Sequence, residues 1–448
     1  MGITIVQKSD LSVRKQEPKV ALVLAGGAVT GGAFKLGGLK ALDDFLVNKK
    51  TTEFDTYVGL SAGAVLAAPL AAGVSPAEML KSLEGKSSRF TRFGPRDVYS
   101  PALREFITCP AQFALDVLTF LPGTVADLLR QMPQLARKLQ EPLGKTWHEP
   151  GVARLQELLE PIGEALAQRR SFPFAVDYLP SGFFDNSSIE RYLRRNFRRA
   201  GIPNDFRNLY RSTKRELYIG AMNLDTAERV VFGHDEDTSA TVSEAVQAST
   251  ALPGFYKPAR IRGVDYVDGG VRRTANIDVA IEHGADLVIC YNPFRPFSNR
   301  VRLAPKDGTD QGGGGRLLAE TGILTVVNQV FRTLLHSRLQ YGLRQYQEDP
   351  NFRGDIVVIE PKETDLRVFQ LSAMAYWERL RAARYGYISV TESIQQNYDL
   401  IKQILGNYSI LMTRKQTRAG VERIRDEDTE DASDVLMHDV PRRNLNVA

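Results

Sequence analysis

The hydrophobic pattern of the first 75 residues predicts two consecutive strand–helix pairs. A short apolar run at 19–24 leads into a glycine-rich stretch, which predicts a buried strand followed by a turn over 25–32. Apolar residues recur at helical spacing over 33–46, a second strand is expected at 54–60, and the small apolar residues of 62–72 predict a closely packed helix. This alternation predicts a βαβ unit on a parallel sheet.

The pattern changes over 76–180. Apolar positions there have helical spacing and frequent prolines interrupt them, which predicts a helical insertion rather than further strands. An amphipathic helix is expected at 187–199 with Ser187 as its N-cap, and another helix over 316–346, with further helices to about residue 411. Short apolar runs predict the remaining strands at 217–222, 229–232, 287–291 and 356–359.

These elements divide the chain into three parts. Residues 18–300 are expected to form one α/β domain with a mostly parallel central sheet, interrupted by the insertion at 76–180. Residues 301–412 are expected to form a helical extension packed on this core, entered through a glycine-rich loop at 307–315. The tail at 413–448 is charged and has few apolar residues, which predicts disorder.

Composition excludes several classes of protein. Of the 448 residues, 43% are hydrophobic and 25% are charged, so a collagen-like or wholly disordered chain is excluded. The two cysteines, Cys109 and Cys290, are too few for a disulfide scaffold or a cysteine-rich zinc module, and we expect neither a metal site nor a cofactor. The 58 basic and 53 acidic side chains give a net charge of +5, which permits an anionic partner without demanding one.

Localisation signals are not evident in the sequence. The first 20 residues lack the apolar stretch of a secretory signal, and Val6 breaks the match of the Met-Gly start to a myristoylation signal. No run of about 18 uncharged apolar residues predicts a membrane-spanning helix, so we expect a cytoplasmic protein. Nucleic-acid binding is not expected, because neither a recognisable module nor a strongly basic balance is present.

The strongest candidate for chemistry is the pentapeptide Gly59-Leu60-Ser61-Ala62-Gly63. This G-x-S-x-G pattern lies between a predicted strand and a predicted helix, which is the context of a nucleophilic serine on a sharp turn. The flanking glycines leave room for a strained backbone, and a helix N-terminus favours developing negative charge. A serine that only caps the helix is the alternative interpretation.

A serine hydroxyl needs a base to become a nucleophile. The chain has five histidines, and Asp268 followed by His283 fits the chain order of a Ser-His-Asp triad in α/β-hydrolases. Against this triad, the serine follows only two predicted strands, and His283 lies near a predicted helix C-terminus, where a histidine commonly acts as a cap. The other candidate base is Asp268 itself, because the two glycines after it let the carboxylate turn into a pocket. Asp-Gly is also common in plain turns.

Four segments together resemble the motifs of the patatin-like phospholipase family, in that family's order. They are the glycine-rich loop 24–34, the serine pentapeptide 59–63, the small-residue stretch 248–255, which ends in Leu-Pro-Gly-Phe, and Asp268-Gly269-Gly270. Asn276 and Gly284-Ala285-Asp286 follow as they do in the family. The resemblance covers roughly 18–75 and 180–295 and is weaker elsewhere.

The resemblance implies a three-layer α/β/α fold and a catalytic domain over 18–300 that hydrolyses lipid acyl esters through a Ser-Asp dyad. Ser61 would be the nucleophile that forms an acyl-enzyme, and Asp268 would accept its proton and later activate water. The oxyanion would be stabilised by backbone N–H groups of Gly26, Gly27, Ala28 and Ala62. The motif glycines are Gly59, Gly63, Gly269 and Gly270. The implied substrate is a glycerophospholipid or another acyl-ester lipid.

The glycine-rich loop departs from the family at two positions. The family has three glycines, a variable residue, a basic residue and a glycine. Here Ala28 stands at the third glycine and Thr30 at the basic position, while Gly31 is kept. Lys35 is the nearest cation and is expected to lie inside the following helix. Three interpretations stay open: a Ser-Asp acyl hydrolase, a Ser-His-Asp esterase that uses His283, and a patatin-fold regulatory or binding protein with reduced turnover.

Two segments are compatible with a lipid partner and with peripheral membrane contact. Basic residues cluster over 191–215 and would attract an anionic lipid surface, although a solvated helix face is the simpler interpretation. The second segment lies in the insertion and either covers an acyl-chain pocket or forms the insertion's own core. Its apolar residues are Phe113, Leu115, Val117, Leu118, Phe120 and Leu121.

Overall fold

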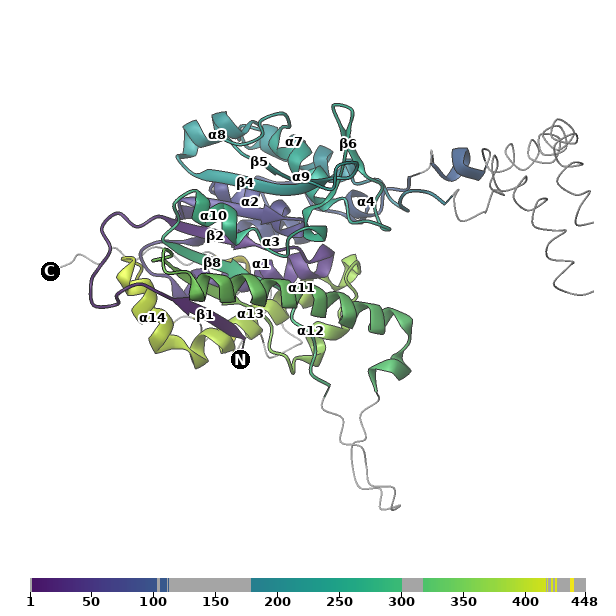
Figure 1. Ribbon diagram of the computed structural model, residues 1–448. Coiled ribbons are helices and arrows are strands. Elements are labelled where there is room, and N and C mark those ends of the chain that lie inside the picture. The colour runs from purple at the N-terminus through teal and green to yellow at the C-terminus, as the bar shows by residue number, and fades with distance from the viewer. Residues whose placement is uncertain are drawn as a thin grey trace, which may run out of the picture. The chain divides into compact units, whose positions relative to one another are not determined.

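A computed structural model of the chain describes residues 2–102, 105–110, 112, 179–299 and 317–415, together with single positions between 417 and 438. The chain divides into two compact units, one formed by Met1–Ser100 with Phe184–Ala448 and the other by Pro101–Phe183. The apolar segment expected at 113–121, the glycine-rich loop at 307–315 and most of the expected tail lie outside the described residues. The larger unit contains all the strands of the sheet (Figure 1).

The larger unit is built on one mixed sheet whose centre is parallel. Its strands follow the order β1 (Ile3–Gln7), β9 (Asp355–Ile359), β8 (Leu287–Tyr291), β2 (Val20–Leu24), β3 (Thr56–Leu60), β4 (Glu216–Asn223), β7 (Val264–Asp268) and β6 (Ala259–Ile261), and β5 (Arg229–Phe232) also pairs with β4. Strands β9, β8, β2, β3 and β4 run parallel, while β1 at one edge and β5, β6 and β7 at the other are antiparallel. The predicted α/β class with a mostly parallel sheet is confirmed.

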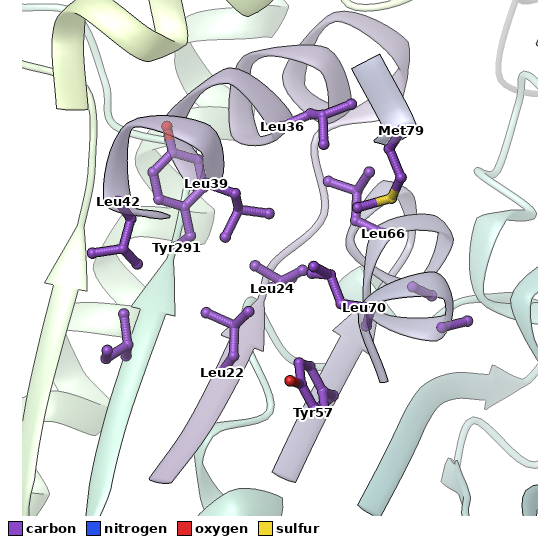
Figure 2. Packing of buried hydrophobic residues seen from close by; sticks show 14 of the residues in the cluster. Leu22, Leu24, Leu36, Leu39, Leu42, Tyr57, Leu66, Leu70, Met79 and Tyr291 are labelled. Atoms are coloured by element: carbon purple, nitrogen blue, oxygen red, sulfur yellow. The ribbon is translucent and has the colours of Figure 1, made fainter. Parts of the chain in front are cut away.

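Helices cover both faces of the sheet, because the side chains of each central strand alternate between two apolar cores. Leu22 and Leu24 of β2 belong to one core and Ala21 and Val23 to the other. Helices α1 (Ala28–Phe45), α2 (Ala62–Ala71) and α3 (Pro76–Glu84) close the first core, and α10 (Ile277–Glu282) and α11 (Ile323–Glu348) close the second. Figure 2 shows leucines of β2, α1 and α2 meeting in the first core.

The remaining helices extend the first layer toward both ends of the sheet. Helices α7, α8 and α9 lie by β4, and α13 and α14 lie by β1 (Figure 1). Their bounds, with those of α4 and α12, are α4 (Pro95–Val98), α7 (Ser187–Arg199), α8 (Phe206–Thr213), α9 (Val242–Thr250), α12 (Leu366–Gln370), α13 (Arg379–Gln396) and α14 (Tyr398–Asn407). Short 3-10 turns are found at Thr51–Glu53, Gly269–Val271, Leu318–Thr321 and Tyr376–Glu378.

Most predicted elements are found, with four differences. The turn expected over 25–32 ends early, because α1 begins at Ala28. Ser187 is the first residue of α7 rather than its N-cap, and its N–H is bound by the carboxylate of Asp185. The edge strands β1 and β6, and β7 between β4 and β6, are not among the predicted elements. The segment after residue 317, expected as a helical extension, also adds β9 to the central sheet.

Candidate active site

Ser61 occupies a strained turn between β3 and α2. Its φ of 53° and ψ of −129° lie in a region that L-residues rarely adopt. The turn depends on the glycines that flank it. A Cβ on Gly59 would come within 2.6 Å of the Ala64 Cα, and one on Gly63 would collide with the carbonyl oxygen of Leu24. The flanking glycines therefore allow the sharp turn that places Ser61 between the carboxyl end of β3 and the first residue of α2.

Strand β4 brings Asp268 to the same place. Leu60, the residue before Ser61, pairs with Gly220 of β4, and Asp268 pairs with the next residue of β4, Ala221. Two strand spacings, about 10 Å between backbones, therefore separate the serine and the aspartate, a gap that two side chains facing each other can close. The glycine after the aspartate keeps this gap clear, because a Cβ on Gly269 would lie 2.6 Å from the Leu60 side chain.

The side chains of Ser61 and Asp268 are both buried and close enough for the Ser61 hydroxyl to favour the ionised form of the Asp268 carboxyl. Burial raises the pKa of the Asp268 carboxyl to about 6, while the bond from Ser61, a bond from the Gly270 N–H and the charge of Lys35 oppose this rise. Such a carboxyl exchanges its proton near neutral pH, which is the property that a general base requires. The structure thus brings together Ser61 and Asp268, the two residues that the sequence predicts as nucleophile and base. Their roles in catalysis are part of the proposal below.

The glycine-rich loop lies directly beside the serine. A Cβ placed on Gly26 would lie 3.4 Å from the Cβ of Ser61. Ala28 and Ala62 are the first residues of α1 and α2, so their N–H groups belong to helical first turns, which leave backbone donors without partners inside the helix. Two helix N-termini, both favourable for negative charge, therefore converge on the serine. Ala28 has a φ of 51°, a left-handed conformation at the position where the family has glycine.

Lys35 lies inside α1, as predicted, and it points into the protein. Its residue is fully buried, and its Nζ donates to the carbonyl oxygens of Ala25 and Gly26. Burial lowers the pKa of the Lys35 ammonium to about 7, against the opposing charge of Asp268. The sequence placed this residue in the helix, but a helix that is buried on nearly all sides gives no periodic signal for the direction of one side chain.

Ser249 is a site residue whose role the sequence reasoning did not assign. It lies in α9, in the small-residue stretch, and is fully buried. Its Oγ accepts the N–H of Ser61 at 2.8 Å and donates to the carbonyl oxygen of Gly220 at 2.6 Å. The backbone of the same stretch also holds the aspartate, because the Asp268 N–H donates to the Ala251 carbonyl at 2.9 Å. This stretch therefore fixes both candidate residues.

An apolar cavity of about 120 Å³ opens onto Ser61. Its lining includes Val29, Leu36, Val65, Leu66, Met79, Phe90, Ile189, Leu193, Met374 and Tyr376, together with Ala28 and Ala62 beside the serine. Leu36, Leu66 and Met79 lie together between α1, α2 and α3 in Figure 2. A cavity with this lining accepts a hydrocarbon chain and offers few partners to a polar one.

His283 lies far from Ser61. Its carbonyl oxygen accepts the Nζ of Lys19, the residue before β2, so the histidine is at the amino end of the parallel strands. Ser61 follows the carboxyl end of β3, which is five residues or about 15 Å away along the sheet. His283 caps α10, its Nδ1 lies 2.8 Å from the Val279 carbonyl, and its ring packs on Tyr218. This placement argues against a triad that uses His283.

Among the described residues, no group of three or more histidine, cysteine, aspartate or glutamate side chains is arranged to hold a metal ion. Within the same part of the chain, no helix is both long enough and apolar enough to cross a bilayer.

Comparison with known proteins assigns the family. A sequence model described as patatin-like phospholipase matches residues 22–281, which is more than half of the chain. The chain belongs to this family, and the resemblance seen in its four motifs is confirmed. The family consists of lipid acyl hydrolases, and membership supports hydrolysis of lipid esters by this chain.

Solved structures with detectable similarity have low sequence identity. VipD from Legionella pneumophila is 14% identical with a TM-score of 0.35, and the match covers 95% of this chain and 78% of VipD. ExoU from Pseudomonas aeruginosa, in complex with SpcU, is 17% identical with a TM-score of 0.27, and the match covers 94% of this chain and 64% of ExoU. Human GIVD cytosolic phospholipase A2 is 10% identical with a TM-score of 0.29, and the match covers 89% of this chain and 61% of the phospholipase. The chain thus spans less than two thirds of the last two proteins.

Proposed function

We propose that this chain is a serine hydrolase that releases fatty acids from glycerophospholipids, of the phospholipase A or lysophospholipase type. The observation that carries the proposal is that Ser61, which lines the apolar cavity, lies beside the buried carboxyl of Asp268 and lowers its pKa against the effect of burial. The Ser61 oxygen attacks the ester carbonyl while its proton passes to the Asp268 carboxylate. The leaving alcohol takes that proton as the acyl-enzyme forms. Asp268 then deprotonates a water that attacks the acyl carbonyl, and it returns this proton to the Ser61 oxygen as the fatty acid leaves.

The negative charge that develops on the carbonyl oxygen needs donors fixed in advance. In this proposal they are backbone N–H groups of Gly26, Gly27 and Ala28 in the loop and of Ala62 after the nucleophile. Their support is positional: Gly26 lies beside Ser61, and the other donors lie at the starts of α1 and α2. The acyl chain occupies the cavity, whose apolar lining favours long chains over short ones.

Release of fatty acid from defined phospholipids tests the proposal. Wild-type protein should hydrolyse phosphatidylcholine or lysophosphatidylcholine, and Ser61→Ala and Asp268→Asn should each lose activity by at least roughly a thousandfold. His283→Ala is the matched control and should keep wild-type activity. Activity that survives Asp268→Asn contradicts the dyad. A folded wild type that binds lipid but releases no fatty acid favours the regulatory interpretation instead.

We also propose that the protein meets the lipid surface through the first half of α11. Ile323 and Leu324 are 72% and 82% exposed, and Val327, Val330 and Phe331 on the following turns are also exposed. This apolar face lies close to the glycine-rich loop. The ring of Phe331 packs edge-on against that of Phe294, with 6.2 Å between the ring centroids, and Phe294 borders Gly26 of the loop. An exposed apolar stripe on a helix is typical of contact with a membrane interface.

The basic segment over 191–215 is a weaker candidate for this contact. It lies over α7 and α8, and neither of these helices carries an exposed large apolar side chain that could enter a bilayer. Arg194 is also engaged by Glu190 at 2.8 Å. Vesicle sedimentation separates the two surfaces: Leu324→Glu should weaken binding to neutral phosphatidylcholine vesicles, whereas the control Arg198→Gln should not. Binding that requires anionic lipid and depends on Arg198 would favour the basic segment.

A further inference from the structure

A buried cation lies directly beneath the glycine-rich loop. Lys35 stands in the second turn of α1, and its Nζ donates to the carbonyl oxygen of Gly26 at 2.9 Å and to that of Ala25. A lysine so close to a helix N-terminus opposes the helix dipole, and burying an ammonium is costly unless acceptors and a negative charge surround it. Both are present here, and both come from the region around Ser61.

The two carbonyls determine where the loop's N–H groups point. In a planar trans peptide the C=O of one residue and the N–H of the next point in opposite directions. Holding the Ala25 carbonyl therefore turns the N–H of Gly26 away from Lys35, and holding the Gly26 carbonyl does the same for the N–H of Gly27. These are two of the donors in the proposed oxyanion site, and Gly26 borders Ser61.

Lys35 also acts on the base through its charge. It lowers the pKa of Asp268 on β7, and Asp268 raises that of Lys35. Cys290 of β8 also lies near Lys35, and burial followed by the charge of Glu360 raises the pKa of its thiol, so Cys290 stays uncharged. The Glu360 carboxylate lies 3.1 Å from the His336 ring. The remaining charged side chains on α1 and on the elements packed against it are Lys40, Asp43, Asp44, Glu53, Glu78, Lys81, Glu84, Glu378, Arg379, Arg381, Arg384 and Glu392.

Resting on the proposed chemistry of Ser61, we propose that Lys35 is a positioning residue that compensates for the basic residue missing from the loop. It holds two loop carbonyls so that the N–H groups are aimed before the oxyanion forms, and its charge favours the ionised form of Asp268. Donors fixed in this way need no rearrangement when the charge develops. Thr30, at the family's basic position, supplies no charge, and its hydroxyl donates to the Ser372 carbonyl at 3.0 Å.

The test compares Lys35→Met and Lys35→Gln with Lys40→Met. Lys40 is a matched control because it is also a buried lysine of α1, paired with Asp44 at 2.6 Å. The measurements are kcat and KM for p-nitrophenyl butyrate, the pH dependence of kcat/KM, and the rate at which an alkyl fluorophosphonate labels Ser61. Circular dichroism verifies folding of each variant.

Lys35→Met should lower kcat roughly tenfold to a hundredfold with KM changed by less than about threefold, because positioning rather than binding is lost. Its acidic limb of kcat/KM should move to higher pH, since Asp268 loses its nearby positive charge. Lys35→Gln should shift the limb equally while losing less kcat, because its amide still donates to a loop carbonyl. Lys40→Met should leave the pH profile unchanged.

A folded Lys35→Met with wild-type kcat and an unmoved acidic limb overturns the inference. If neither Lys35 variant folds, the wild type decides: kcat/KM and the labelling rate should fall again as pH rises past about 7, where Lys35 loses its proton. A plateau that extends to about pH 9 would overturn the inference. Failure of the proposed function looks different, because the wild type would then show neither hydrolysis nor labelling that depends on Ser61.

Discussion

The N–H of Ser61 donates to the Oγ of Ser249 at 2.8 Å, and that hydroxyl donates in turn to the Gly220 carbonyl at 2.6 Å. A residue of α9 therefore holds the strained backbone of the turn that carries the candidate nucleophile. The strain at Ser61 persists only because surrounding contacts of this kind oppose relaxation. The small-residue stretch around Ser249 thus has a physical task, which is to connect α9 to both β3 and β4.

Ser249→Ala should lower both stability and turnover. It leaves the buried N–H of Ser61 without its acceptor, which costs about 1–3 kcal/mol of the free energy of unfolding, and relaxation of the turn should reduce kcat by roughly tenfold. Ser243→Ala is the control, because Ser243 is equally buried in α9 but bonds Glu190 at 2.9 Å instead. Denaturant unfolding and ester hydrolysis measure the two effects. Equal loss of kcat in both variants would contradict a specific role for Ser249.

Ala28→Gly tests whether the loop's departure from its family limits activity. Ala28 has a φ of 51°, and glycine adopts this conformation without strain, so the free energy of unfolding should rise by about 0.5 kcal/mol. The N–H positions do not depend on the Cβ, and kcat should stay within about threefold of wild type. Ala227→Gly, at an exposed turn with a φ of 56°, should show the same gain in stability. A more than tenfold rise in kcat for Ala28→Gly alone would mean that the alanine impairs turnover.

Gly63→Ala should destabilise the fold. Its Cβ would collide with the carbonyl oxygens of Leu24 and Ala25, so β2 and α2 would have to separate. Overpacking of this kind costs about 1–3 kcal/mol. Gly342→Ala is the matched control, because it also lies in a helix but faces open space, and it should gain about 0.5–1 kcal/mol from better helix propensity. A thermal melt in which both variants match the wild type would contradict the close approach at Gly63.

The parts of this site that the sequence predicted are those encoded locally. The strand, turn and helix around Ser61 follow from consecutive residues, because an apolar run, paired glycines and small helix formers each act over a few positions. The neighbourhood of Asp268 is different. Strand β7 reaches Ser61 only through the register of β4, and the pairing of β4 with β3 joins residues more than 150 positions apart in the chain. A single sequence carries no local signal for such a pairing. The prediction that Asp268 lies near Ser61 therefore rested on the order of the four motifs.

The residues that support the site were harder to recognise. Helix α1 is buried on nearly all sides, so periodicity does not single out the direction of Lys35. Ser249 was visible as a small residue in a motif, but the partner of its hydroxyl lies on another element. Strand β1 escaped prediction because it is short and half-buried and pairs with β9, which lies about 350 residues further along the chain.

Asp268 should make activity and stability respond to pH in opposite directions. Its pKa is raised from 3.8 to about 6, so the carboxylate needed as base accumulates as pH rises through about 6, and kcat/KM should rise with it. The folded state binds this proton more tightly than the unfolded state does. The stability contributed by the group is therefore fully present below about pH 4 and is lost as pH rises through about 6.

The free energy of unfolding of Asp268→Asn minus that of wild type should therefore grow by about 2 kcal/mol between about pH 4.5 and about pH 6.5. Lys35 stays mostly protonated over this range, so its charge is nearly constant in both proteins. Asp265→Asn is the control, because Asp265 pairs with the exposed Arg260 and such ion pairs contribute little to stability. The free energy of unfolding of Asp265→Asn minus that of wild type should change less between the two pH values. Urea unfolding at the two pH values measures these differences. A difference for Asp268→Asn that is flat with pH would show that Asp268 titrates as an ordinary carboxyl and is not the poised base that the mechanism requires.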